Sequence, residues 1–257
     1  MILDRFRMDG RVAIVTGAGR GIGEGAAMAM AEMGADLVVA ARTTEQIEAV
    51  AERVRGLGRR ALAVPCDVNE RSQIEAVVSR TMEEFGRIDV LVNNAGGSPP
   101  MPALRTSEKM FEAALRFNVT SAFLMSRLVI PHMQEGHGGS IVNISSAAGR
   151  LPQAQFVAYG TAKAALSFMT RQLAAEFAPL VRVNAVAVGA TATSSLLPFL
   201  NDDTRAAMEQ RTPMRRIGTV EDISIAVLYL ASAASSWVTG KVLEVDGGTE
   251  STNWPFD

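Results

Sequence analysis

The 257-residue sequence has few of the residues that mark secreted, metal-binding or nucleic-acid-binding proteins. Cys66 is its only cysteine, so no disulfide can form within the chain and a reducing cytoplasm is the expected location. The 25 basic and 27 acidic residues leave a formal charge of −2 and no basic stripe, which argues against a nucleic-acid partner. No cluster of His, Cys and Asp has metal-ligand spacing, so we expect no metal site.

The sequence also lacks the long apolar stretches of leaders and membrane spans. Its opening segment, MILDRFRMDG, carries charged residues at positions 4, 5 and 7 and has no apolar core, unlike a signal peptide. No apolar run looks long enough to cross a bilayer. We therefore expect a soluble protein that does not enter a membrane.

Seven short runs of Val, Ile, Leu and Ala alternate along the chain with longer amphipathic segments. Continuously apolar runs are typical of strands buried on both faces of a parallel sheet. We predict strands at 11–17, 35–41, 60–68, 88–96, 139–146, 181–189 and 241–248, and helices at 22–33, 44–57, 70–85, 107–134, 160–177 and 221–232. The alternation predicts an α/β fold: one doubly wound, Rossmann-type domain over residues 1–257, with a seven-stranded parallel sheet flanked by helices on both faces.

The longest departure from this alternation is residues 190–220, between the last two predicted strands. Its segment SSLLPFL is apolar, and long excursions of this kind are often functional lids. We predict that residues at about 190–214 close over an apolar substrate, with Leu196, Leu197 and Met214 offering contacts. The alternative is a segment that packs on the body of the protein and touches no ligand.

A glycine-rich turn follows the first predicted strand and opens the first predicted helix. In TGAGRGIG (16–23), Gly17, Gly21 and Gly23 follow a G-x-x-x-G-x-G spacing, with Ile22 between the last two. Glycines let the backbone approach a pyrophosphate, which then meets the positive end of a helix. A glycine-rich turn taken alone fits a tight turn without a ligand as well as it fits a dinucleotide site. Because this one lies at the first strand-to-helix junction of a predicted parallel sheet, it predicts a dinucleotide site.

The end of the second predicted strand bears on the choice of cofactor. A carboxylate there binds the ribose 2′-hydroxyl of NAD, whereas an arginine accommodates the 2′-phosphate of NADP. Here the strand ends in Ala41 and Arg42, and Arg20 in the glycine-rich turn adds a second cation. We therefore predict NADP, with NAD the less favoured cofactor; the alternative is that both arginines are solvated surface charges.

The stretch YGTAK places Tyr159 four residues before Lys163, in a segment with helical periodicity. Positions i and i+4 share a helix face, so the phenol and the ammonium lie one turn apart. A phenol titrates near pH ~10 and a neighbouring cation favours its ionised form. The pair predicts an acid–base site, against the alternative of an exposed aromatic beside a solvated lysine.

These motifs occur together in a known order. TGAGRGIG, CDV, NNAG, Asn118, NISS, YGTAK and GKVLEVDGG stand at the spacing of the short-chain dehydrogenase/reductase family, which the chain resembles over nearly its whole length. Within that family, NNAGGSPP, TPMRRIGTVEDI and SSWVTGK look most similar to bacterial 7α-hydroxysteroid dehydrogenases, although related acyl-carrier-protein reductases carry similar segments.

The resemblance implies a role for each residue of the motifs. Tyr159 would be the acid–base, and Ser146, thirteen residues earlier, would hydrogen-bond the substrate oxygen. Lys163 would bind the nicotinamide ribose and lower the phenol pKa, while Asn118 would hold a water in a proton relay. Ser145 is the weaker candidate for the substrate oxygen, because neighbouring strand residues point to opposite faces.

The same resemblance implies the cofactor contacts. Asp67 and Val68 would lie at the adenine, Asn93, Ala95 and Gly96 along the cofactor, Gly189 at the end of the sixth strand, and Thr193 at the nicotinamide carboxamide. One position departs from the family pattern: Val188 stands where a proline is usual, which frees a backbone N–H and predicts a slightly altered nicotinamide pocket.

Together these features predict an NADP-dependent oxidoreductase that interconverts a secondary alcohol and a ketone on a lipophilic, steroid-like substrate. The alternative enzyme is a 3-oxoacyl thioester (acyl-carrier-protein) reductase, and the non-enzyme alternative is a nucleotide-sensing regulator. The predicted helices 107–134 and 160–177 carry apolar residues on more than one side, which predicts a homo-oligomer. The resemblance implies that these two helices form a shared four-helix interface, so we expect a homotetramer.

Overall fold

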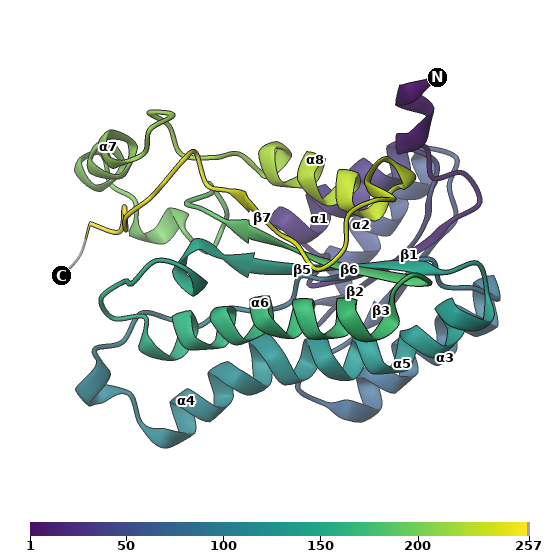
Figure 1. The fold of residues 1–257 in the computed structure, drawn as a ribbon, viewed down its shortest axis with the longest axis horizontal. Helices are drawn as coiled ribbons and strands as arrows, with labels where there is room; N and C mark the ends of the chain where they lie inside the picture. The colour runs from purple at the N-terminus through teal and green to yellow at the C-terminus, as the bar shows by residue number, and fades with distance from the viewer. Residues whose placement is uncertain (256–257) are drawn as a thin grey trace.

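All seven predicted strands are present in the computed structural model, which describes residues 1–255. They are β1 (Val12–Thr16), β2 (Asp36–Ala41), β3 (Ala61–Pro65), β4 (Val90–Asn93), β5 (Gly139–Ser146), β6 (Val181–Val188) and β7 (Val242–Val245). Every pairing is parallel, in the order β3-β2-β1-β4-β5-β6-β7, with helices on both faces of the sheet (Figure 1). The predicted fold class is confirmed.

The helices also follow the predicted segments. The α-helices are α1 (Gly21–Glu32), α2 (Thr44–Gly56), α3 (Arg71–Phe85), α4 (Glu108–Leu115), α5 (Ser121–Glu135), α6 (Val157–Phe177), α7 (Asp202–Arg211) and α8 (Val220–Ala231). Shorter helical turns are η1 (Ile2–Phe6), η2 (Ala103–Arg105), η3 (Arg116–Thr120), η4 (Ala147–Gly149), η5 (Leu197–Phe199) and η6 (Ala233–Ser235). Helix α7 and turn η5 lie within the predicted lid.

The side chains of β1 point alternately into two separate cores. Ala13 and Val15 pack with residues of α1, α2 and α8, whereas Val12 and Ile14 pack with residues of α3, α5 and α6. Figure 1 shows these two groups of helices on opposite faces of the sheet. Burial on both sides explains the uninterrupted apolar sequence of the strand, since each buried Val or Ile contributes roughly 1.5–3 kcal/mol.

The strand order reverses between β1 and β4. In open α/β sheets, ligands bind outside the carboxyl ends of the strands at such a reversal. Strands β1, β4 and β5 end at Thr16, Asn93 and Ser146, so these residues meet at one edge of the sheet. That edge is where a cofactor and substrate site is expected.

The predicted helix 107–134 is interrupted. Helices α4 and α5 are joined by η3, a π-helical turn that contains Asn118, and the Asn118 Nδ2 donates to the Ala114 carbonyl at 2.9 Å. By length and composition alone, Glu108–Glu135 is the one helical stretch within residues 1–255 that could cross a membrane, contrary to the sequence-based expectation. Here it serves as a core helix, with Met125 and Val129 buried on the face that packs against the sheet.

The amino end of the sheet is fixed by a buried carboxylate. Asp89, 4% exposed, accepts hydrogen bonds from the Arg11 and Arg87 guanidiniums at 2.8 and 2.6 Å and from the Val12 N–H at 2.9 Å. Burial raises the pKa of Asp89, but the bonds from Arg87, Val12 and Arg11 outweigh this effect and hold the pKa below its ordinary value. The carboxylate therefore ties the start of β1 to the start of β4.

We expect Asp89→Asn to lower the free energy of unfolding by about 1–2 kcal/mol near neutral pH, because two charge-assisted bonds are lost and both arginines are partly exposed. The contribution of the carboxylate is present above its ordinary pKa and is lost as pH falls through the lowered folded value, so the difference should shrink in acid. Urea unfolding at fixed protein concentration measures it. Asp9→Asn, which removes the exposed pair with Arg7, is the control and should have a much smaller effect; equal losses would contradict the role of Asp89.

Candidate active site

Two loops at the carboxyl edge of the sheet are joined by hydrogen bonds. The Thr16 Oγ1, buried at the end of β1, accepts from the N–H groups of Asn94 and Ala95 at 3.0 and 3.1 Å. In return, the Asn94 Nδ2 donates to the carbonyls of Thr16 and Gly17 at 3.0 and 3.1 Å. The sequence analysis missed Asn94; the doubled asparagine of NNAG is the signal that could have found it.

The glycine-rich turn needs glycine for reasons visible in its geometry. Gly17 and Gly21 have φ values of +63° and +58°, and a Cβ on Gly23 would lie 2.3 Å from the Gly17 carbonyl oxygen. Helix α1 begins at Gly21, and its N-cap Arg20 makes no side-chain hydrogen bond to the helix end. The turn therefore leaves a helix N-terminus available for an anion, as a pyrophosphate site requires.

Other predicted cofactor residues gather around this turn. A Cβ on Gly21 would lie 3.7 Å from the Thr193 methyl group, so the predicted lid begins beside the turn. Ile22 is half-buried against the core formed with α1, α2 and α8. Gly189 packs directly on Asp246, because a Cβ there would lie 2.5 Å from the Asp246 Cα.

Arg20 and Arg42 both point into solvent. Each is exposed, and neither forms an ion pair within residues 1–255. Ala41 ends β2 without a carboxylate, and Asp36, at the start of the same strand, is paired with Arg59 at 3.0 Å. Arg42, directly after β2, and Arg20, in the glycine-rich turn, are therefore exposed cations without an ion pair in the described residues.

The ends of β3 and β4 carry the residues assigned to the adenosine half. Asp67 Oδ1 accepts from the backbone N–H and the Nδ2 of Asn69, at 2.9 and 3.0 Å, and Val68 is buried beside it. The Asn93 Nδ2 points inward, donating to Asn143 Oδ1 at 2.9 Å and Ser126 Oγ at 3.1 Å. Because the side-chain amide of Asn93 is engaged in the protein interior, only its backbone is available to contact a cofactor.

Ser146 and Tyr159 meet at the candidate reaction centre. Ser146 ends β5, Tyr159 lies in the first turn of α6, and both side chains line one cavity. Burial raises the pKa of the Tyr159 phenol, and its interaction with the Ser146 hydroxyl offsets this only in part. The two hydroxyls together can hold one substrate oxygen.

Lys163 is directed to a backbone carbonyl in this structure. The residue is 4% exposed, and its ammonium donates to the Ile144 carbonyl at 2.7 Å and lies 5.7 Å from the centre of the Tyr159 ring. Burial lowers the pKa of Lys163 to about 8. The expected lowering of the phenol pKa by Lys163 stays a prediction.

The two serines of NISS face opposite ways. Ser145, 2% exposed, hydrogen-bonds the Lys163 carbonyl at 3.0 Å and the Ser167 hydroxyl at 2.8 Å, and so fixes α6 on the sheet. Ser146 instead lines the cavity described below. The alternation of strand side chains thus directs only Ser146 to the cavity.

Asn118 fixes the loop that passes Lys163. Its Oδ1 accepts from the Gly97 N–H at 2.8 Å, and its Nδ2 donates to the Gly97 carbonyl at 3.0 Å. A Cβ on Gly96 would lie 2.7 Å from Asn118 Oδ1 and 3.0 Å from Lys163 Nζ. Gly96 therefore passes between the side chains of Asn118 and Lys163. A larger residue at position 96 would displace one of these two side chains.

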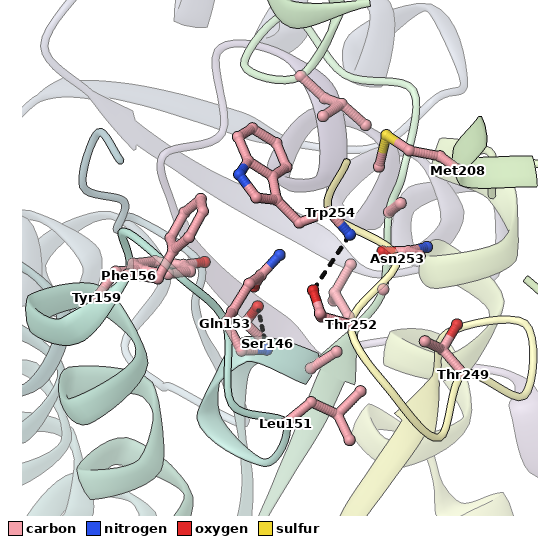
Figure 2. A pocket seen from close by; sticks show the side chains of 16 residues that line it. Ser146, Leu151, Gln153, Phe156, Tyr159, Met208, Thr249, Thr252, Asn253 and Trp254 are labelled. Carbon is pink, nitrogen blue, oxygen red and sulfur yellow. Dashed lines mark hydrogen bonds between the residues drawn. The ribbon is translucent and has the colours of Figure 1, made fainter. Parts of the chain in front are cut away.

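A cavity of about 140 Å³ opens beside Ser146 and Tyr159 (Figure 2). Its lining residues come from β5 to α6 (Ser146, Ala147, Ala148, Leu151, Gln153, Phe156, Tyr159), from β6 and the segment after it (Val188, Gly189, Ala190, Leu196, Met208), and from the C-terminal tail (Thr249, Thr252, Asn253, Trp254). Within residues 1–255, no charged side chain lines it.

Three features of this cavity differ from the sequence-based expectations. Leu196 lines the cavity, but Leu197 and Met214 are 48% and 63% exposed and do not. The C-terminal tail was not anticipated, since nothing in its sequence signals a wall. Val188, in the position of the usual proline, pairs with Ser146 of β5 and Val245 of β7, so β6 continues as regular strand to the cavity.

Comparison with known proteins identifies the family. The family model described as enoyl-(acyl carrier protein) reductase matches residues 17–250. The 7α-hydroxysteroid dehydrogenase of Escherichia coli is 37% identical over 246 residues, which are 95% of this chain and 96% of the relative. The chain belongs to the short-chain dehydrogenase/reductase family. As a member of this family it is an oxidoreductase, and its relatives act on CH–OH groups.

Other members of the family extend the comparison. An uncharacterized oxidoreductase of Mycobacterium tuberculosis is 48% identical, over 96% of this chain and 95% of the relative. A solved 7α-hydroxysteroid dehydrogenase, in complex with NADH and 7-oxo glycochenodeoxycholic acid, has a TM-score of 0.93 at 37% identity and covers 96% of this chain and 97% of its own. A gluconate 5-dehydrogenase from Burkholderia cenocepacia, in complex with NADP and tartrate, has a TM-score of 0.91 at 35% identity, over 96% and 98% of the two chains.

The lowered pKa of Lys163 gives a pH-dependent prediction. Between about 8, its pKa in the folded protein, and its ordinary value, the unfolded chain binds a proton that the folded chain does not. Stability should therefore rise with pH in this window, and Lys163→Met should lose that rise. Thermal unfolding at about pH 7 and about pH 9.5 measures it, with the exposed Lys109→Met as control. If the stability of the parent and of Lys163→Met changes with pH in the same way, the assignment of a lowered pKa to Lys163 is wrong.

Proposed function

We propose that this protein is a cytoplasmic, NADP-dependent oxidoreductase that interconverts a secondary alcohol and a ketone on a lipophilic, steroid-like substrate. The observation that carries the proposal is that Ser146 and Tyr159 both line an uncharged cavity, with Lys163 one helical turn away from Tyr159. Binding of a nucleotide alone does not require the whole set of Ser146, Tyr159 and Lys163, which argues against a regulator without turnover.

The residues supply the proton chemistry that such a reaction needs. When bound, the nicotinamide supplies or accepts the hydride. The ketone oxygen lies between the hydroxyls of Ser146 and Tyr159, Ser146 donates a hydrogen bond, and Tyr159 delivers the proton as the alkoxide forms. In the direction of alcohol oxidation, Tyr159 takes that proton back. The Lys163 ammonium holds the ribose and favours the phenolate once a ligand draws it from the Ile144 carbonyl.

The glycine-rich turn fits the phosphates of a dinucleotide. The left-handed Gly17 and Gly21 let the backbone approach the ligand, and the uncapped start of α1 offers N–H groups to the pyrophosphate. Gly96 lets the loop after β4 pass between Asn118 and Lys163 without displacing the lysine that would hold the ribose. Asp67, Val68, Ala95, Gly189 and Thr193 would complete the contacts.

NADP is favoured over NAD by the charges at the end of β2. Arg42 and Arg20 are unpaired with acids in the described chain, and Ala41 presents no carboxylate to a 2′-hydroxyl. The two relatives above carry NADH in one case and NADP in the other, so the preference rests on these residues of the chain itself.

A lipophilic substrate is favoured by the composition of the cavity. The cavity has apolar walls, formed by Leu151, Phe156, Leu196, Met208 and Trp254. Among the described residues that line it, no acidic or basic side chain is available to bind a charged substrate. The lid at about 190–214 contributes Leu196 and Met208 to these walls. The description of the matching family model keeps an acyl-carrier-protein thioester reductase as the second candidate.

We also propose a homotetramer. Phe123 on α5 and Phe168 on α6 are 41% and 58% exposed, on the helices that carry the predicted interface. Large aromatic side chains in contact with water on neighbouring helices favour association with a second copy.

Tyr159→Phe should keep cofactor affinity and lose at least about 100-fold in kcat for ketone reduction, the usual scale for a positioned acid–base. NADPH absorbance against ketosteroids, acetoacetyl thioesters and small diketones measures turnover and identifies the substrate class. Tyr229→Phe, which changes the only other tyrosine, is the control. If Tyr159→Phe turns over within threefold of the parent, the assignment of the acid–base is wrong.

Arg42→Ala should remove most of the preference for NADPH over NADH, which we expect to be roughly 10- to 150-fold in kcat/KM from one charge-assisted bond. Because Arg42 is exposed to solvent, we expect a preference near the lower limit of this range. The preference should weaken as the salt concentration rises. Arg80→Ala, at an exposed arginine on α3, is the matched control. A parent enzyme that prefers NADH would show that Arg42 does not meet the cofactor.

A further inference from the structure

The C-terminal tail, residues 249–254, closes one side of the cavity (Figure 2). Trp254, 8% exposed, packs its indole edge-on against Phe156, with ring centres 5.1 Å apart and planes at 89°. It also contacts Phe199 of η5, at 5.9 Å and 63°. Trp254 therefore joins the loop before α6 to the predicted lid.

These rings form a row that starts at the reaction centre. The Phe156 ring lies 5.9 Å from the Tyr159 ring, and Trp254 and Phe199 follow beyond it. A substrate whose carbonyl reaches Tyr159 extends along this row toward the indole. The indole already packs against two aromatic rings without a ligand, so it acts as a wall and does not need a substrate to order it.

The wall is fixed by polar contacts along the tail. The Arg211 guanidinium donates to the Trp254 carbonyl at 3.1 Å, and the Asn253 Nδ2 donates to the buried Thr212 Oγ1 at 3.0 Å. At the other end of the tail, Arg150 donates to the Thr249 carbonyl at 2.7 Å. The tail that carries the indole cannot move away from the cavity without breaking contacts to α7 and to Thr212, the residue that follows it.

We propose that Trp254 is the specificity-determining residue that limits substrate size, and that Arg211 holds it in place as a positioning residue. The inference rests on the proposed function, because it assumes that a ketone binds between Tyr159 and the indole. Among the lipophilic ketones that the proposed function covers, we expect compact ones to fit between the reaction centre and the wall and a steroid to reach Tyr159 only after the wall shifts. Removal of the indole should therefore favour the steroid relative to the compact ketone.

The test compares 2,3-butanedione with a 7-oxo steroid in the parent, Trp254→Ala and Trp254→Phe. We expect the ratio of kcat/KM for the steroid to kcat/KM for the diketone to rise at least tenfold in Trp254→Ala and less in Trp254→Phe. Trp237→Ala, at the other tryptophan, which is 99% exposed, is the matched control and should change nothing. An unchanged ratio in both Trp254 variants would overturn the proposal.

Arg211→Met tests the positioning role. Arg211→Met should raise the ratio of kcat/KM for the steroid to kcat/KM for the diketone, by less than Trp254→Ala does. The change should lie in KM and not in kcat, because the variant loosens the tail without removing the indole. Arg205→Met on the same helix, where the arginine lies within 3.8 Å of Glu209, is its control. A change confined to kcat, or equal changes in both variants, would show that Arg211 does not hold the wall.

Calorimetric titration separates this inference from the proposed function. With oxidised cofactor bound no ketone can be reduced, and the 7-oxo steroid should bind at least tenfold more tightly to Trp254→Ala than to the parent. If no variant turns over a ketone but this difference in affinity is found, the role of Trp254 in limiting substrate size is supported and the proposed reaction is wrong. If the parent and Trp254→Ala bind the steroid with equal affinity, and thermal unfolding shows that both are folded, the proposed role of Trp254 is wrong.

Discussion

Burial of the parallel sheet on both faces is the constraint on which the rest of the structure depends. Helices cover each side of β1, so the side chains of residues 12–15 are buried in two apolar cores and are not available to a ligand. Reactive groups are therefore restricted to the carboxyl edge, where strands end and loops begin. Ser146 at the end of β5 and the loop after β4 lie at this edge because the strands are parallel and in register.

Desolvation at this edge has opposite effects on two neighbouring groups. The same burial raises the pKa of the Tyr159 phenol and lowers that of Lys163 to about 8, so burial shifts each side chain toward its neutral form. The Lys163 ammonium offsets part of this desolvation through its hydrogen bond to the Ile144 carbonyl.

Most of the fold follows from sequence patterns that are local. Continuous apolar runs gave the strands to within a few residues, and the glycine spacing gave the turn before α1, because each depends on residues close together in the chain. The interruption at η3 was missed, since the apolar pattern continues through Asn118 and only its contacts with Gly97 and Ala114 reveal the π-helical turn. The place of Trp254 in the cavity was missed for the same reason: it depends on Phe156 and Phe199, which are distant in sequence.

The position of Asp89 has a consequence for how this protein can be altered. Its bonds to Arg11 and Arg87 lie at the amino edge of the sheet, a full strand length from Ser146 and Tyr159. Changes separated by this distance, with no shared partners, combine nearly additively. Thermostability could therefore be engineered by strengthening the amino edge while the carboxyl edge is redesigned for new ketones, and the gain at one edge would offset the destabilisation that redesign introduces at the other.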